Sequence, residues 1–134
     1  MLRKSYLILF ISFVVMGCKS NDSLKADEEL RAIHLDSPKF SKFGPRIAER
    51  QDVKSTNETE TEHFLSMRDA SFELEDIKVD IFGDIAVTTF YNNYSFIKNK
   101  IRVQGKGRVT LVFLNTEAGW KIVHEHSSPF NPQI

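Results

Sequence analysis

The feature that most constrains this chain is an alternation of side chains in its last third, between Gly107 and Ser128. Apolar residues occupy every second position in two runs, which is the period of a β-strand whose successive side chains point to opposite faces. A polar, glycine-containing segment, residues 115–119, separates the runs and predicts a hairpin loop. The second run places on one face Trp120, Ile122, His124 and His126. A face that combines apolar bulk with titratable groups is typical of the wall of a ligand pocket.

The middle of the chain predicts further strands and a sharp bend. Apolar residues change parity across Glu75 and Asp76, and a β-bulge produces such a change because one extra residue flips the alternation and bends the strand. A strand over residues 85–91 then returns, rich in residues that favour strands. Residues 92–100 are either an extension of this strand or an aromatic loop over a pocket mouth. A short extended piece is expected at residues 40–43.

Two helices are predicted before the sheet. The first covers residues 24–33, with Leu30 and Ile33 facing inward, and a following Asp-Ser-Pro segment ends it. The second covers residues 58–67. We expect His63, a lone histidine near the end of this helix, to be a surface or boundary residue and not a ligand.

Several segments resemble one family of domains. They are Gly105-x-Gly107-Arg108-x-Thr110 together with Gly119 to Ser128, Gly83 to Thr89, and His34 to Pro45. They resemble the SnoaL-like domains of the nuclear transport factor 2-like superfamily. The first of them, the C-terminal stretch that ends at Ser128, is also similar to the end of the calcium/calmodulin-dependent protein kinase II association domain. The resemblance covers residues 30–128 of a domain that we place at residues 24–128, followed by a C-terminal tail at 129–134.

The resemblance implies an α+β fold, the nuclear transport factor 2-like cone. A curved, mainly antiparallel sheet packs on one or two N-terminal helices, with a pocket between them, and an exposed sheet face favours a homodimer. Residues 19–33 leave room for one of the two helices that usually precede the segment resembling His34 to Pro45. The pocket is therefore either more open than usual or covered by a partner chain.

The candidate ligand-binding residues are Tyr91, Arg108, Trp120, His124 and His126. His124 and His126 could ligate a divalent ion if a third ligand converged on them, but no third His or Cys has a convincing spacing, so we predict no metal and no cofactor. Where the association domain carries a pocket arginine, this chain has Ser127.

Three functions are compatible with these residues. The leading prediction is non-catalytic binding of a small, partly apolar molecule. The alternatives are an acid–base enzyme of the isomerase, cyclase or dehydratase type, and a non-catalytic dimeric scaffold of the cell envelope. An enzyme would use a histidine, or a carboxylate of raised pKa such as Asp76 or Asp80, but both acids are expected to be exposed at a strand edge. The sequence leaves the catalytic status open.

The first residues predict export and lipidation. Arg3 and Lys4 precede an apolar run, residues 6–16, that is too short to span a bilayer as a helix, and Gly17-Cys18 ends it as in a bacterial lipobox. We expect residues 1–17 to be a lipoprotein signal peptide, Cys18 to be lipidated, and residues 18–23 to form the lipidated cysteine and a spacer. The chain would be anchored to a bacterial membrane, facing the periplasm or the cell surface. An ordinary secretory signal with a chance cysteine is the alternative.

The charge balance argues against a nucleic-acid partner. The chain has 18 basic and 18 acidic residues, and removal of Arg3 and Lys4 leaves 16 basic residues, a net charge of −2. Nucleic-acid binding would require a clustered basic face. The chain also contains one cysteine, so it has no internal disulfide.

Overall fold

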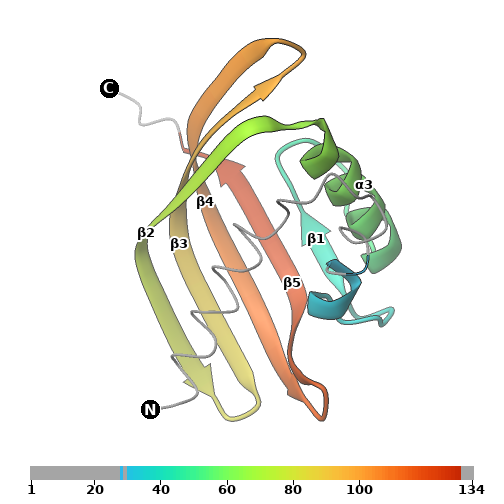
Figure 1. Ribbon diagram of the computed structural model, residues 1–134. Helices are drawn as coiled ribbons and strands as arrows, with labels where there is room; N and C mark the ends of the chain where they lie inside the picture. The colour runs from blue at the N-terminus through green and yellow to red at the C-terminus, as the bar shows by residue number, and fades with distance from the viewer. Residues whose placement is uncertain (1–27, 29, 131–134) are drawn as a thin grey trace.

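A computed structural model describes residues 28 and 30–130 of the chain. Its centre is a curved five-stranded sheet with the strand order β1-β5-β4-β3-β2 (Figure 1). The described elements are β1 (Ser41–Phe43), α3 (Val53–Ser66), β2 (Arg68–Phe82), β3 (Ile85–Lys98), β4 (Ile101–Thr116) and β5 (Gly119–Pro129). Neighbouring strands are antiparallel except for β1 and β5, which are parallel. The predicted α+β fold is confirmed.

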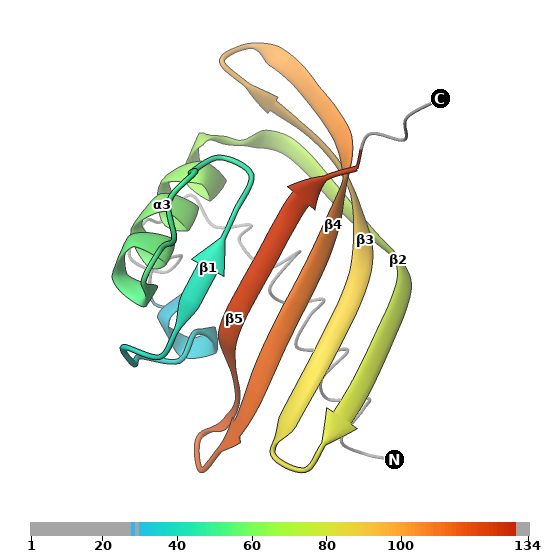
Figure 2. The ribbon, with the colours of Figure 1, turned by 180° about the vertical axis from the view of Figure 1, so that it is seen from behind.

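The helix and the sheet are arranged so that β1 lies between α3 and the long strands. Figures 1 and 2 show that β2 starts at the end of α3 and curves away from it to the far edge of the sheet. The sheet therefore wraps around one side of a space that α3 and the segment after β1 close from the other side.

Helix α3 starts five residues before the predicted position. Asp52 caps it by accepting a hydrogen bond from the backbone N–H of Ser55 at 2.8 Å, which satisfies one of the free donors of the first turn. The buried residues of α3 are the polar Thr56, Asn57 and Glu60, so an apolar pattern could not reveal the first turns. Of the first predicted helix, residues 28 and 30–33 are helical and the rest lies outside the described residues.

The predicted bulge in β2 is confirmed. The register of β2 against β3 shifts between Glu75 and Lys78, and Asp76 has a φ of 51°. Residues 92–98 continue β3 as a strand, and a two-residue turn at Asn99 and Lys100, both of positive φ, leads into β4. The hairpin formed by β3 and β4 projects beyond the other strands as an arm (Figure 1).

A second bulge, which the sequence pattern did not predict, lies in β5. Val112 pairs with His124 but Phe113 pairs with Ile122, so Val123 is an extra residue. The bulge flips the alternation, and Ile122 therefore faces inward while His124 and His126 face outward. The prediction that Ile122 shares a face with the two histidines is wrong for this reason.

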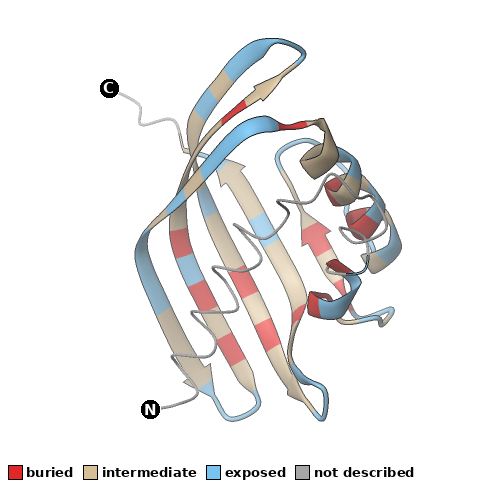
Figure 3. Cartoon of the chain, in the orientation of Figure 1, coloured by how far each residue is buried: buried red, intermediate tan, exposed pale blue. Residues whose placement is uncertain are grey.

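The apolar core is built mainly from residues of the central strands β3 and β4, along which Figure 3 shows buried positions. It consists of Phe40, Ala86, Phe90, Leu111, Phe113 and Ile122, and Trp120 packs against it. Leu30 and Ile33 are also buried, as predicted. Two members of the core, Phe90 and Leu111, also line a cavity, so the core and the cavity adjoin each other.

Candidate functional site

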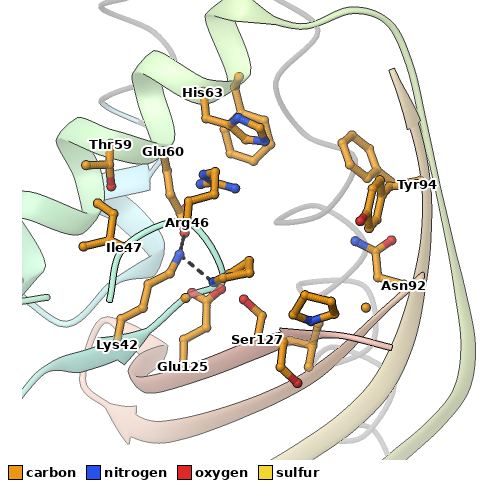
Figure 4. A pocket seen from close by; sticks show the side chains of 18 of the residues that line it. Lys42, Arg46, Ile47, Thr59, Glu60, His63, Asn92, Tyr94, Glu125 and Ser127 are labelled. Atoms are coloured by element: carbon orange, nitrogen blue, oxygen red, sulfur yellow. Dashed lines mark hydrogen bonds and ion pairs between the residues drawn. The ribbon is translucent and has the colours of Figure 1, made fainter. Parts of the chain in front are cut away.

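A cavity of about 440 Å³ lies between α3, the segment after β1 and the inner face of β3, β4 and β5 (Figure 4). Its volume falls within the range of about 300–1,000 Å³ typical of small-molecule sites. Much of the lining is apolar and comes from β2, β3 and β4, with Phe64 added from α3: Phe64, Phe72, Phe90, Phe96, Val103, Val109 and Leu111. Polar and charged side chains gather at the end near β1 and α3, namely Lys42, Arg46, Thr59, Glu60, His63 and Glu125.

An ion-pair cluster anchors this polar end. Lys42 forms ion pairs with Glu60 and, at 3.3 Å, with Glu125. Burial alone would lower the pKa of Lys42, but the charges of Glu125 and Glu60 together raise it. Burial likewise opposes ionisation of Glu60, yet the neighbouring Lys42 ammonium holds the pKa of Glu60 below its usual value. Lys42 and Glu60 are therefore both charged at neutral pH.

The parallel pairing of β1 with β5 creates the cluster. Lys42 lies opposite Glu125 in this register, so their side chains emerge on the same face, and Glu60 reaches them from α3. On its other side, the backbone of Lys42 exchanges two hydrogen bonds of 3.0 Å with Gln51. Three segments that are far apart in the sequence thus hold one buried ammonium group.

His34 borders the cluster and brings a third potential metal ligand to it. Ligand atoms of His34, Glu60 and Glu125 lie within 4.8 Å of one another, and His34 Nδ1 forms a 2.8 Å hydrogen bond with Asn57 Oδ1. The Lys42 ammonium already bridges the two carboxylates and supplies a positive charge where an ion would bind. We therefore describe this group as an ion-pair cluster.

His63 is half-buried, a boundary residue as the sequence predicted, and its side chain also lines the cavity. Burial and the positive charges of Arg46 and Lys98 lower the pKa of His63 to about 4, so its ring is neutral at pH 7. The ring contacts Phe96 on the β3–β4 arm edge to face, with ring centroids 5.5 Å apart. Its Nδ1 is buried and has no partner among the described residues. Thr56, Glu60 and His63 are spaced so that they share one face of the helix, and this spacing could have indicated that His63 faces the cavity.

Strand β3 also contributes polar groups to the cavity. Asn92 and Tyr94 point into the cavity (Figure 4), and Asn92 Oδ1 is buried without a partner among the described residues. The Tyr94 ring covers Gly105, where a Cβ atom would overlap the phenol group. Tyr94 also stacks on Phe96, with ring centroids 6.0 Å apart.

None of the five candidate residues from the sequence belongs to this cavity lining. His124 and His126 flank the ring of Phe43 on the outer face, and His124 Nδ1 lies 2.8 Å from Ser41 Oγ. Tyr91 and Arg108 are neighbours in the β3–β4 register and pack around Phe130.

The other candidates also lie elsewhere. Trp120 packs on the core, Asp76 is exposed at the β2 bulge, and Asp80 pairs with Lys78 at 3.0 Å. Ser127 does line the cavity.

Comparisons with known proteins agree with this architecture. One similar structure is a protein of the nuclear transport factor 2-like superfamily from Salmonella enterica serovar Typhimurium LT2. It matches with a TM-score of 0.83 and 18% identity, and the match covers 98% of this chain and 93% of the other. A candidate dehydratase of the same family from Streptomyces avermitilis matches with a TM-score of 0.80 and 20% identity, covering 94% of each chain. A nuclear transport factor 2-like protein from Cytophaga hutchinsonii matches with a TM-score of 0.73 and 15% identity, covering 97% and 100%. At these identities the matches establish the fold.

No curated protein sequence matches this chain significantly. The family model of the SnoaL-like domain matches residues 24–132. This match spans most of the chain and includes every described element of the cone. The chain therefore belongs to the SnoaL-like domain family.

Proposed function

We propose that this protein binds a small, partly apolar molecule in the cavity between α3 and the inner face of the sheet. The observation that carries the proposal is the division of the cavity into an apolar wall and a polar end. Such a site buries the body of a ligand and orients it through a few polar groups. The binding residues we assign are those of the inner face, in place of the outward-facing His124 and His126.

The charge states favour binding over proton transfer. A general acid or base works best when its pKa lies near the operating pH. The pKa of His63 is about 4, and Lys42 and Glu60 stabilise each other in their charged forms. Acid–base catalysis is the second candidate function, because Glu125, a member of the ion-pair cluster, lines the cavity and the similar protein from Streptomyces avermitilis is a candidate dehydratase.

Native mass spectrometry of the full chain, purified in mild detergent, tests the binding proposal. Ser127→Phe fills the cavity, whereas His126→Phe adds the same ring to the outer face of the same strand. We expect a small molecule to co-purify with the wild type and with His126→Phe and to be lost from Ser127→Phe. Loss in His126→Phe with retention in Ser127→Phe would place the site on the outer face and contradict the proposal.

We also propose that the domain is anchored to the cell envelope through lipidated Cys18. The support is the sequence of residues 3–18, which lies outside the described residues. Among residues 28 and 30–130, no helix has the length and apolar character needed to cross a membrane. We expect labelled palmitate to be incorporated into the wild type and not into Cys18→Ala. Equal labelling of both chains would refute this anchor.

A further inference from the structure

Arg46 is a cavity side chain whose charge has no direct partner. It lies on the segment that follows β1, and Figure 4 shows its side chain beside Glu60 and His63. Within the described part of the chain, no carboxylate lies within ion-pair distance of its guanidinium and no group is hydrogen-bonded to it. Arg50, four residues later, instead packs over the Phe43 ring at 5.1 Å. Arg46 is thus available to a ligand, whereas Arg50 is engaged elsewhere.

The charge of Arg46 acts inside the cavity. After burial, its positive charge is the next cause that lowers the pKa of His63, and it also opposes protonation of Lys42 and favours ionisation of Glu60. Arg46 is an exposed residue, but its side chain lies among the residues that line the cavity (Figure 4). The guanidinium is therefore accessible from solvent and borders the space that a ligand would fill.

The lining carries an excess of one positive charge. Its basic residues are Lys42, Arg46 and Lys98, its acidic residues are Glu60 and Glu125, and His63 is neutral at pH 7. The charge of Lys42 is paired with the carboxylates of Glu60 and Glu125. A ligand with a single negative charge would balance the lining, whereas a dianion such as a phosphate monoester would leave one negative charge uncompensated.

The shape of the site selects the type of anion. A guanidinium presents a planar fork of donors that matches a carboxylate in a bidentate arrangement. The same cavity is also lined by aromatic and aliphatic side chains, including Phe64 and Phe90. These can bury an apolar body of modest size within about 440 Å³.

We propose that the ligand is a small carboxylic acid with an apolar body, and that Arg46 binds its carboxylate. This inference rests on the proposed function, since it takes the inner cavity as the binding site. It goes further by assigning the chemical class of the ligand and the residue that selects it.

Calorimetric titration of the full chain in mild detergent tests the inference with three probes of one shape. These are 3-phenylpropanoate, 3-phenylpropanamide and 3-phenylpropan-1-ol. We expect the wild type to bind the acid about tenfold more tightly than the other two, the effect of one charge-assisted bidentate contact. Arg46→Gln should remove this preference. Arg50→Gln removes the same charge from the same segment and should retain it.

The outcomes separate this inference from the proposed function. Equal binding of the three probes, or a preference that survives in Arg46→Gln, would overturn the role of Arg46 while leaving the cavity as a binding site. Failure of the wild type to bind the acid would also overturn the inference. The proposed function then depends on its own readout, the co-purified molecule that Ser127→Phe excludes. Circular dichroism spectra of both arginine variants check that the fold is retained.

Discussion

Lys42 is 4% exposed and lies between two carboxylates, one on α3 and one on β5. A buried charge is costly unless it is paired, and Lys42 and Glu60 here depend on each other for their charged states. The cluster holds two negative charges and one positive charge, and His34 lies beside it with a buried Nε2 that has no partner among the described residues. The polar end of the cavity is therefore strongly sensitive to the loss of the ammonium group.

We expect Lys42→Met to destabilise the protein markedly. The substitution keeps the length of the side chain but leaves Glu60 and Glu125 without their buried partner. Removing one member of a buried ion pair costs about 3–5 kcal/mol of the free energy of unfolding. Urea denaturation measures the loss. Lys54→Met is the control, because Lys54 is exposed and lies 4.0 Å from Glu58, a contact worth about 0.3–0.5 kcal/mol. Equal losses in the two variants would contradict the structural role of Lys42.

His63 should make stability fall between pH 6.5 and about 4. The unfolded chain binds a proton at the ordinary pKa of 6.5, whereas burial and the charges of Arg46 and Lys98 lower the pKa of the folded chain to about 4. The contribution of the neutral His63 ring to the free energy of unfolding is thus fully present above pH 6.5 and is lost as the pH falls toward 4. Because His63 is partly exposed, solvent screening reduces the effect to about 1–2 kcal/mol.

Urea denaturation of the wild type and His63→Gln at several pH values measures this dependence. The His63→Gln variant should not show the loss of stability that the wild type shows between pH 6.5 and about 4. Glu60 has a lowered pKa, so its contribution is present above its ordinary value of 4.5 and is lost only as the pH falls below that value. A variant that loses stability between pH 6.5 and 4.5 as steeply as the wild type would exclude His63 as the cause.

Among the elements, the β3–β4 arm depends on the close approach of the Tyr94 ring to Gly105. A Cβ atom at Gly105 would overlap the Tyr94 ring, whereas one at Gly107 would meet Ser128 O at an ordinary 3.6 Å. Gly105 therefore allows Tyr94 to lie flat across β4 and to form part of the cavity wall.

We expect Gly105→Ala to displace the Tyr94 ring and to lower the free energy of unfolding by about 1–3 kcal/mol, the typical cost of overpacking. Gly107→Ala is the matched control in the same strand and should change it by less than about 1 kcal/mol. Urea denaturation of the two variants and the wild type measures the free energy of unfolding. If the two alanine variants behave alike, the contact between Gly105 and Tyr94 does not control the arm.

The elements also show which parts of the fold could be predicted from the sequence. The bulge at Glu75 and Asp76 was visible because the apolar residues on its two sides have different parity. The bulge at Val123 was hidden, since Ile122 and Val123 are both apolar and the alternation with His124 could continue unbroken. Helix α3 begins earlier than predicted because it buries polar residues such as Thr56 and Asn57, which an apolar pattern cannot detect.

At the scale of the whole molecule, the cavity is built from contacts between segments that are distant in the sequence. Lys42 meets Glu125 only because a three-residue strand pairs in parallel with β5, and Glu60 reaches them from a separate helix. No local spacing relates these residues. The resemblance predicted the cone and its pocket, but one extra residue in β5 decided which side chains enter the pocket.

The same extra residue leaves an outer face that we expect to associate two copies of the chain. His126, Thr110 and Thr89 form one row across β5, β4 and β3, with Phe43 beside His126. An isologous contact between two such faces would give a dimer with the two cavities on its outside. The variant Thr89→Glu/His126→Glu places two charges on this face at exposed positions that are not directly opposite each other.

We expect size-exclusion chromatography with light scattering to give the mass of two chains for the wild type and of one chain for this variant. Both chains contribute the two substitutions, so four unpaired carboxylates would be desolvated, and the penalty is several kcal/mol for each buried ion. Ala48→Glu/Ala118→Glu adds the same charge at two exposed loop positions and should remain dimeric. A monomeric wild type, or a dimer that withstands both substitutions on the outer face, would refute association through this face. Because the cavity opens on the other side of the sheet, ligand binding should persist in the monomer.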